Sequence, residues 1–474
     1  MKTKRLFQNI GFYFLGTFST KILQFLFIPL YTSYIITSDF GYYNLILSLV
    51  SLVIPLLYQS IWEGILRFTI EEENRFEILS TTNIYCAGIS IIYSILFILL
   101  SILIDIQYGF LILIMGLSHM GVSYWQFTAR ALKQNKIFAI STVANSAVTI
   151  ALNLYLIIVL NWGILALFLA NMIGNISMII IIESKIKLFK RTKLREFNPI
   201  LLKSILKYSL PLSINALSWW LITSSNNLVI SNRIGVEANG IYAMASRFGS
   251  IMTLITSVIN MAWLEEAFRT YGDSDKDYYF NSVLNILTRI VLSGVAILIP
   301  ITYLFFNFFV FGDYYEGVYL TPIIYLSAAY STLAAHLGSG FLARKESDII
   351  FKTTLIGGIV STVGGFLLAK SFGVISVVIT SLIGYIIMYL IRAPLLKKRM
   401  NLNIDFNALI GLTIFSFVIM FITSLNPRNA IYQVCVLIIT SLILIVLNRK
   451  ELMLLIISFK SIIHKKMIDS QGYK

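Results

Sequence analysis

The sequence is poor in charged residues, in cysteine and in nucleotide-binding signatures. Charged residues make up 12% of its 474 residues, about half of the roughly 25% that is typical of a soluble domain. The two cysteines, Cys86 and Cys435, lie inside apolar runs, so neither a disulfide framework nor a cysteine-based metal site is expected. No glycine-rich loop followed by Lys-Ser or Lys-Thr occurs, which argues against direct ATP hydrolysis. Redox chemistry and a resident metal are therefore not indicated.

Long apolar runs take the place of these features. Hydrophobic residues make up 58% of the chain, in runs long enough to cross about 30 Å of hydrocarbon. We predict an all-α integral membrane protein with about 14 transmembrane helices. The predicted spans are 8–35, 42–66, 80–104, 109–130, 137–160, 164–183, 208–234, 241–268, 283–310, 320–343, 349–370, 374–392, 406–425 and 430–448. No small-residue cleavage pattern follows the basic start, so we expect the first span to be retained.

The basic residues indicate the orientation of these spans. With the N-terminus in the cytoplasm, 31 of the 37 lysines and arginines fall in cytoplasmic segments, including the four from Arg392 to Arg399. Such an asymmetry is the positive-inside signal, and it places both termini in the cytoplasm. The net charge of +15 then reflects topology and contact with anionic inner-leaflet lipid, at about 1 kcal/mol per residue. No nucleic-acid partner is needed to explain it.

An internal repeat divides the chain. Residues 31–48 match residues 230–247 at one constant offset, with a shared Gly-x-Tyr at Gly41 and Gly240. Of the first twelve spans, six precede and six follow the polar connection at residues 183–207, so the halves share one orientation and are related by an axis along the membrane normal. The predicted parts are a six-helix lobe (1–184), a basic linker (185–207), a second six-helix lobe (208–400), two further helices (401–448) and an interfacial cytoplasmic tail (449–474).

Lys21 is the residue that most requires an explanation. It lies about 13 residues into the first span, at a depth of about 20 Å, which is too far for its side chain of about 6 Å to reach the surface. A charge there costs between about 3 and more than 10 kcal/mol, so Lys21 is expected to face water, a counter-ion or a substrate. Gln24 lies on the same helical face. The alternative is a buried ion pair, for which Glu63 is the candidate partner.

Two further arginines and two histidines lie within spans. Arg247 lies about a third of the way in from the outer side, where it either binds substrate or reaches outward to the surface. Arg289 is close enough to the cytoplasmic end of its span to reach that boundary. His119 and His336 are expected to be core histidines, with His119 hydrogen-bonded. A cavity that offers cations and few acids selects an anion, and phosphate or pyrophosphate fits by charge-assisted hydrogen bonds.

Ionisable residues recur at equivalent positions of the two halves, and they are candidate gates. Two Glu–Arg pairs have the i,i+4 spacing of an intrahelical ion pair, and two carboxylates lie at equivalent outer turns. The pairs are either solvated helix ends or an inner gate, and the outer carboxylates either start helices or form an outer gate. The residues are Glu63 with Arg67, Glu265 with Arg269, and Asp39 and Glu237.

With these motifs the sequence resembles the polysaccharide-unit flippases of the multidrug/oligosaccharidyl-lipid/polysaccharide exporter superfamily. The resemblance is carried by the cation before "PLY", by "SDFGYYNL", by "LPLSINAL" (210–217) and by "ANGIYAMASRFG" (238–249), in order over residues 5 to 400. It implies a flippase rather than an enzyme, without a cofactor. It also implies that Lys21 and Arg247, and less clearly Arg67, bind substrate in a cationic cavity, and that the last two helices form a groove for the lipid tail.

The resemblance further implies a substrate and a location. The substrate is an undecaprenyl-pyrophosphate-linked oligosaccharide for a capsule, an O-antigen or a similar polymer, moved to the outer leaflet of the bacterial plasma membrane by alternating access. The expected partners are this substrate, anionic membrane lipids, and a polysaccharide polymerase and glycosyltransferases, with no nucleic acid. The alternatives are a flippase for the peptidoglycan precursor lipid II, and a multidrug or cation antiporter of the same superfamily.

Overall fold

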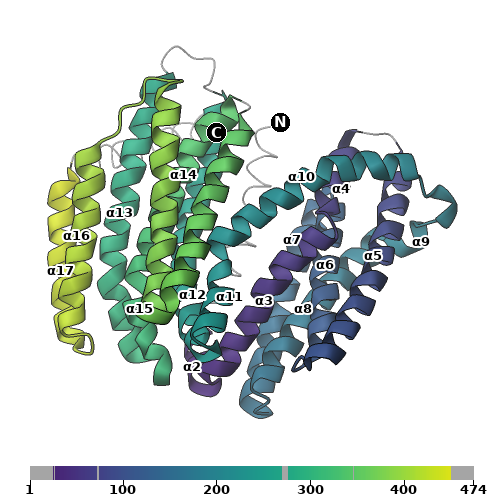
Figure 1. Ribbon diagram of the computed structural model, residues 1–474, viewed down its shortest axis with the longest axis horizontal. Helices are drawn as coiled ribbons and strands as arrows, with labels where there is room; N and C mark the ends of the chain where they lie inside the picture. The colour runs from purple at the N-terminus through teal and green to yellow at the C-terminus, as the bar shows by residue number, and fades with distance from the viewer. Residues whose placement is uncertain (1–24, 26, 72–73, 270–275, 345, 450–474) are drawn as a thin grey trace, which may run out of the picture. The chain divides into compact units, whose positions relative to one another are not determined.

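The computed structural model describes residues 25 to 449 apart from 26, 72–73, 270–275 and 345. All regular structure in this part of the chain is helical (Figure 1). The α-helices are α2 (Ile28–Tyr34), α3 (Thr37–Leu57), α4 (Ile61–Glu71), α5 (Arg75–Ile104), α6 (Gly109–Ala131), α7 (Asn135–Leu154), α8 (Ile164–Ile186), α9 (Leu188–Arg191), α10 (Pro199–Thr223), α11 (Ser225–Arg233), α12 (Val236–Arg269), α13 (Lys276–Phe309), α14 (Thr321–Ala343), α15 (Ser347–Lys397), α16 (Phe406–Leu425) and α17 (Ala430–Leu447). Shorter turns are η1 (Tyr155–Val159), η2 (Leu194–Glu196) and η4 (Gly312–Tyr319).

The prediction of an all-helical, multi-pass membrane protein is confirmed. Among the described residues, 9 helices are long and apolar enough to cross a membrane, or 10 if the bent pair of η4 and α14 forms one span. The extreme case is α5, whose apolar window has a mean hydropathy of 2.6 and is only 6% buried. Large apolar side chains that the protein does not cover are typical of a lipid-facing helix.

Two predicted spans are broken in the structure. The predicted helix 42–66 is divided between α3 and α4 because Gln59 and Ser60 take positive φ angles of 51° and 45°, a conformation that no helix accommodates. The predicted helix 208–234 is divided between α10 and α11 at Ser224, with φ −126° and ψ −18°. Neither break contains glycine, so the apolar pattern runs through both without a signal.

The long helix α15 consists of two arms. Gly373 has φ 67° and ψ −162°, which interrupts the helix at the point where the sequence predicts a boundary between spans 349–370 and 374–392. Residues before Gly373 contact residues after it, and the contacts that start further from Gly373 on one side also end further from it on the other. The hydroxyls of Ser361 and Ser381 lie 2.9 Å apart, and a Cβ added at Gly357 would lie 2.8 Å from the carbonyl oxygen of Gly384. Such pairing means that the two arms run antiparallel, so this region supplies two spans.

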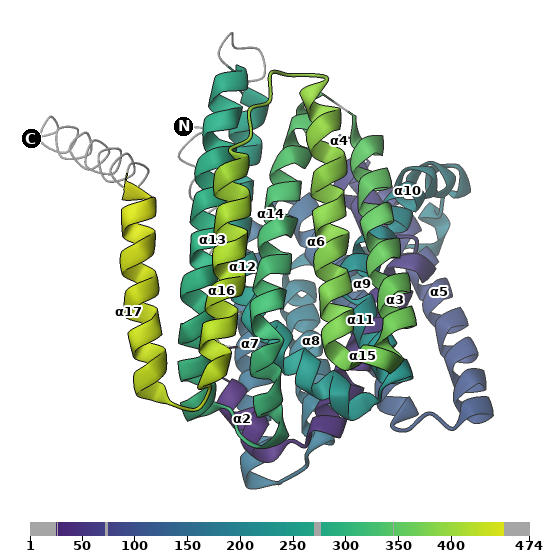
Figure 2. The same ribbon diagram turned by 60° about the vertical axis from the view of Figure 1, so that its left-hand side comes forward.

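The chain forms two compact units. The first comprises Met1–Leu254, Phe311–Tyr315 and Asp348–Gly384, and the second comprises Ile255–Val310, Glu316–Ser347 and Tyr385–Lys474. In the first unit α6, α7 and α8 pack side by side (Figure 1). In the second unit α14, α16 and α17 pack on α13, and Figure 2 shows α16 lying along α13. The division into two six-helix lobes and a final helix pair stays a prediction.

Candidate functional site

The two copies of the repeat meet at two glycines in the first unit. Helices α3 and α12 cross so closely that a Cβ on Gly41 would overlap the carbonyl oxygen of Val236, and a Cβ on Gly240 would overlap that of Thr37. The contact is reciprocal, because residues 37 and 41 stand at the same offset from residues 236 and 240. Only glycine allows two helix backbones to approach this closely. The Gly-x-Tyr element found in the sequence is thus a helix-crossing motif.

Hydrogen bonds extend this crossing toward its end. The side-chain amide of Asn239, itself fully buried, donates to the carbonyl oxygen of Gly41 at 2.8 Å. The hydroxyl of Tyr314 donates to the carbonyl oxygen of Ile35, between α2 and α3, at 3.0 Å. Ile35 is the C-cap of α2, where carbonyls commonly lack a partner within the helix, whereas the carbonyl of Gly41 belongs to the first turns of α3. The end of the bundle formed by the starts of α3 and α12 is therefore closed by backbone contacts.

A second row of hydrogen bonds joins α3 to α10. The indole of Trp220 donates to the carbonyl oxygen of Ser48 at 2.8 Å. The hydroxyl of Ser48 donates to the carbonyl oxygen of Ser224, also at 2.8 Å. Two turns further along α3, the hydroxyl of Ser213 donates to the carbonyl oxygen of Pro55 at 3.0 Å. Bonds of side chains to backbone are each worth about 1 kcal/mol, so this row holds α10 against α3 from Ser48 to Pro55.

Arg247 lies two turns beyond Gly240 on α12, against aromatic rings. Its guanidinium carbon is 4.6 Å from the ring centre of Tyr31 and 4.8 Å from that of Phe40, which is within the range of a cation–π contact. Both rings are buried, Tyr31 at 7% and Phe40 at 0% exposure, and Asn153 of α7 donates to the Tyr31 hydroxyl at 3.2 Å. Four helices, α2, α3, α7 and α12, thus supply this half-buried cation and its surroundings.

Several predicted site residues lie outside the described part of the chain. Lys21 and Gln24 precede it, and α12 is described at Glu265 and Arg269 only as backbone. The nearest described residue of the first span is Phe25. Its ring packs edge-on against Phe248, the neighbour of Arg247, at a centroid distance of 5.2 Å. The first span and the Arg247 region of α12 are therefore adjacent at this level.

The other predicted gate residues are divided between buried and exposed positions. Glu63 of α4 is half-buried, and the charge of Arg130, from the neighbouring helix α6, acts on it. Arg67, one turn further along α4, is exposed. Asp39 and Glu237 lie in the first turns of α3 and α12. A carboxylate in the first turn of a helix is stabilised by the positive end of the helix dipole, so both positions suit the predicted role of starting a helix.

A buried polar network, which the sequence did not predict as a unit, joins α6, α7 and α8. The ring of His119 bonds Asn171 through Nε2 at 3.0 Å, as expected for a hydrogen-bonded core histidine. Asn175, one turn on, donates to Asn171 at 3.2 Å and to Ser118 at 3.1 Å, and it accepts from Asn145 at 3.1 Å. The signal available in the sequence was the i,i+4 spacing of two asparagines within an apolar run.

In the second unit the side chains of one arginine and one histidine are almost completely buried. Arg392 was expected in a cytoplasmic connection, but it is 1% exposed and donates to the carbonyl oxygen of Ala334 at 2.7 Å. The helix of α15 continues past it to Lys397, which keeps it inside the bundle. His336 is also 1% exposed, stacked on Trp263 at 4.6 Å and beside Phe280 at 4.8 Å. The prediction of a core histidine is confirmed.

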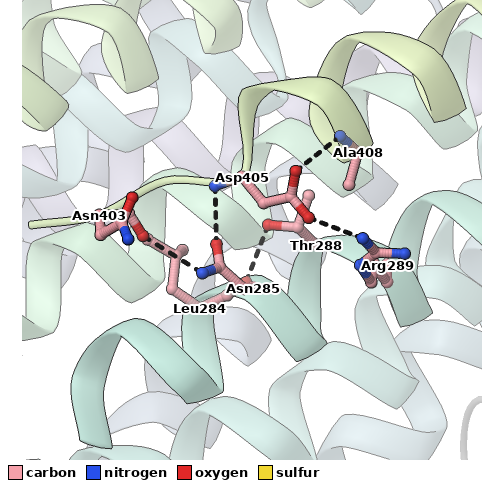
Figure 3. A network of polar contacts seen from close by, with 7 residues as sticks. All are labelled: Leu284, Asn285, Thr288, Arg289, Asn403, Asp405 and Ala408. Atoms are coloured by element: carbon pink, nitrogen blue, oxygen red, sulfur yellow. Dashed lines mark hydrogen bonds and ion pairs between the residues drawn. The ribbon is translucent and has the colours of Figure 1, made fainter. Parts of the chain in front are cut away.

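Arg289 forms an ion pair with Asp405 across the start of α16. Its guanidinium donates to Asp405 Oδ2 at 2.7 Å, while Asp405 Oδ1 accepts from the backbone N–H of Ala408 at 3.0 Å (Figure 3). Partial burial raises the pKa of Asp405, but the Ala408 amide and the Arg289 guanidinium outweigh it and hold the pKa below its ordinary value. The prediction that Arg289 reaches the end of its span agrees with this partner.

We expect this ion pair to stabilise the fold only while Asp405 is ionised. Since its folded pKa is depressed, the contribution is present above the unfolded value of about 3.9 and is lost as pH falls through the folded value. Asp405→Asn keeps an acceptor for Ala408 and should cost at most about 1 kcal/mol at neutral pH. Asn429→Ala, which removes the cap of α17, is the control, with a loss of about 1 kcal/mol that is unchanged between neutral pH and a pH below the folded pKa of Asp405. Thermal unfolding in detergent measures both, and a pH-independent Asp405→Asn loss would contradict the assignment.

A model of the family described as "Polysaccharide biosynthesis protein" matches residues 6–264. This range is more than half of the chain, and it contains the glycine crossing and Arg247. The chain belongs to this polysaccharide biosynthesis protein family. No curated protein matches this family member.

Solved structures give the fold of this polysaccharide biosynthesis protein. It is similar to the lipid II flippase MurJ in an inward closed conformation, with a TM-score of 0.72 and 16% identity over 93% of this chain and 99% of that one. An inward-facing multidrug resistance MATE family transporter of the MOP superfamily gives a TM-score of 0.63 and 15% identity over 80% and 98%. A Vibrio cholerae MATE transporter gives a TM-score of 0.54 and 15% identity over 84% of this chain and 96% of that one. At these identities the likeness establishes the fold alone.

The family and the fold together describe a multi-pass membrane protein of the polysaccharide biosynthesis protein family whose fold is similar to those of MurJ and of MATE transporters. The predicted resemblance to the polysaccharide branch of the superfamily is confirmed by the family match.

Proposed function

We propose that this polysaccharide biosynthesis protein is a flippase that moves undecaprenyl-pyrophosphate-linked oligosaccharides from the inner to the outer leaflet by alternating access. The observation that carries the proposal is the position of Arg247. It lies about 10 Å from the glycine crossing, at 1.5 Å per residue, and it is a half-buried cation held against the rings of Tyr31 and Phe40. A guanidinium carries five N–H donors in a planar fork that matches the geometry of phosphate, which makes Arg247 the proposed ligand of the head group.

The span count of the proposed architecture is fourteen. Spans one, two and seven are then the broken ones, made of the first predicted span with α2, of α3 with α4, and of α10 with α11. The two arms of α15 count separately, and η4 continues into α14. The halves share one orientation, and the reciprocal contact at Gly41 and Gly240 supports a twofold axis between them along the membrane normal.

Orientation follows from the basic connections. With these in the cytoplasm, the closed end at Gly41 and Gly240 faces the outside, and substrate enters from the cytoplasm. The pyrophosphate of the head group is then bound by Lys21 with Arg247, and movement of the lobes exposes it to the other side. Net export requires a gradient or consumption of the product, because the rearrangement by itself only redistributes access.

The basic linker is a second contact with the membrane in this proposal. Its eight lysines and arginines, from Lys185 to Lys207, are all exposed. Three apolar side chains that lie among these cations are exposed as well, Phe189 at 61%, Leu194 at 80% and Ile200 at 78%. Cations interspersed with apolar side chains suit the head-group region of an anionic leaflet. Anionic lipid is therefore the proposed partner of this surface.

Reconstitution tests the function. Purified protein in liposomes should move an undecaprenyl-pyrophosphate-linked fluorescent oligosaccharide between leaflets, measured by its accessibility to an impermeant quencher. A prenyl glycoside without phosphate should not move, because nothing pairs with the two cations. Equal movement of both lipids would contradict the proposal, and selective movement of lipid II would favour the peptidoglycan alternative.

Arg247→Gln should lower the rate of this movement about tenfold to a hundredfold. A charge-assisted hydrogen bond is worth about 1.5–3 kcal/mol, and each 1.4 kcal/mol is a factor of about ten. Arg233→Gln is the matched control, since Arg233 is stacked on the Phe366 ring at 3.5 Å but lies away from the proposed cavity. An unchanged rate in Arg247→Gln, or equal losses in both variants, would remove Arg247 from the binding site.

A further inference from the structure

Two polar linkers of this protein lie along helices of their own unit, one of them extended and the other containing the 3₁₀ turn η2. The C-terminal strap, residues 401–405, lies along the start of α13 (Figure 3). The backbone N–H groups of Asn401, Asn403 and Asp405 donate to helix side chains, and the carbonyl oxygens of Asn401 and Asn403 accept from helix side chains. The bonds are Asn401 N to Asp277 (2.8 Å), Asn281 to Asn401 O (2.7 Å), Asn403 N to Asn281 (2.9 Å), Asn285 to Asn403 O (3.2 Å) and Asp405 N to Asn285 (3.0 Å).

The two periodicities explain why this ladder forms. Residues four apart on a helix are separated by about 6 Å, and residues two apart in an extended chain by about 6.6 Å. An asparagine side chain carries one acceptor and a donor group, so Asn281 and Asn285 each pair with the strap as a neighbouring strand would. The ladder ends at Asp405, which binds Arg289 and caps α16.

A second ladder holds the basic linker. The N-terminal strap, residues 192–198, lies along the start of α5, and its last residue, Asn198, caps α10 by accepting from the N–H groups of Ile200 and Leu201. Its bonds to α5 are Asn83 to Thr192 (2.8 Å), Lys193 N to Ser80 (3.3 Å), Ser80 to Glu196 (2.9 Å), Thr81 to Glu196 O (3.3 Å), Asn198 N to Thr81 (3.1 Å) and Asn198 to Glu77 (2.7 Å).

The two straps occupy equivalent places in the repeat. Each follows the sixth predicted helix of a lobe, lies on the first turns of the third, and ends at the cap of the next helix. Their sequences, "TKLREFN" and "NLNID", share no pattern. The common feature is a row of small polar side chains at helical spacing on α5 and on α13.

The helix that follows the N-terminal strap is also fixed at its start. Gly64 of α4 lies so close to α10 that an added Cβ would be 2.5 Å from the side chain of Ile205. Four residues after Lys207, Pro211 interrupts the hydrogen bonding of α10, because proline has no N–H to donate to the carbonyl four residues before it. Beyond Pro211, α10 is joined to α3 by the hydroxyl bond of Ser213 to Pro55 and the indole bond of Trp220 to Ser48.

We propose that both straps stay bound to their own helices throughout the transport cycle, and that α10 bends at Pro211 when the lobes move. The basic linker is then a clasp and not a hinge. The straps position α10 and α16 at fixed points, and the bonds from Ser213 and Trp220 to α3 are those that break. The cycle itself rests on the proposed flippase function, whereas the clasps are a property of the fold.

Disulfide cross-linking separates a clasp from a hinge. In a variant with Cys86→Ser and Cys435→Ser, the pair Asn83→Cys and Thr192→Cys ties the strap to α5. After oxidation, verified by mass spectrometry, this protein should flip lipid within twofold of its reduced form. The pair Ser48→Cys and Ser224→Cys ties α3 to the far part of α10 and should lower the rate at least tenfold. A tenfold loss in the strap pair, restored by reductant, would overturn the proposal.

Two further measurements distinguish failure of the clasp from failure of the function. Hydrogen exchange at the amides of Asn401, Asn403 and Asp405 should be at least tenfold slower than in exposed loops, and Asn281→Leu with Asn285→Leu should abolish this protection. Fast exchange in the unmodified protein refutes the clasp, whatever the protein transports. Pro211→Ala restores the missing N–H and should lower flipping about tenfold without changing that exchange, and an unchanged rate would refute the bend at Pro211.

Discussion

Gly240→Ala should separate α3 from α12 and stop transport. The added methyl group would overlap the backbone carbonyl of Thr37, which cannot rotate away as a side chain would. We expect a loss of about 3 kcal/mol in stability, the upper end of overpacking costs, and a flipping rate reduced at least about tenfold because the closed end no longer forms. Thermal unfolding and the liposome assay measure the two effects.

The control for this substitution lies in the same protein. Gly411, within α16, has no atom within 4 Å of the position that a Cβ would take. Gly411→Ala should therefore be neutral or stabilise the helix by up to about 1 kcal/mol. Gly41→Ala should reproduce the Gly240→Ala defect, because the contact is reciprocal. Normal stability and transport in both crossing variants would show that the close approach has no role.

Lys21→Ala should reduce flipping by about tenfold to a hundredfold. The argument is the cost of a charge at mid-span, which only water, a counter-ion or a substrate offsets, together with the packing of Phe25 against Phe248 beside Arg247. Lys21→Arg keeps the positive charge and should retain part of the rate. Both variants are compared in the liposome assay with the pyrophosphate-linked lipid.

Lys370→Ala is the matched control for Lys21. Lys370 is an exposed lysine near the bend of α15, so its removal should leave the rate within twofold. Full activity of Lys21→Ala would discard this residue as a binding group. Equal losses in Lys21→Ala and Lys370→Ala would indicate a general dependence on positive charge.

Helix positions were largely predictable where apolar runs end in polar turns. The predicted span 406–425 coincides with α16, and 164–183 lies within α8. Hydrophobic transfer into lipid depends on local composition alone, which explains this agreement. It also explains the failure at Gln59 and Ser60, since a left-handed turn inside an apolar run leaves no compositional trace.

The candidate site was predictable in part. The sequence marked Gly41 and Gly240 as a repeat, but their contact depends on how two helices 199 positions apart cross. Likewise, nothing near Arg247 in the chain indicates Tyr31 and Phe40 as its neighbours. The charge asymmetry placed Arg392 among exposed cytoplasmic residues, and the structure buries it, because helix length is set by packing as well as by hydropathy.

The amino-acid sequence by itself determined that this protein is a helical, multi-pass membrane protein with an internal repeat, because spans and repeats are written in local composition and order. The tertiary structure decided which backbone groups touch at the closed end, what surrounds Arg247, and that both linkers are bound as straps. These features depend on partners far apart in the chain, such as Asn285 and Asp405, whose pairing becomes visible only when the helices that carry them have packed together.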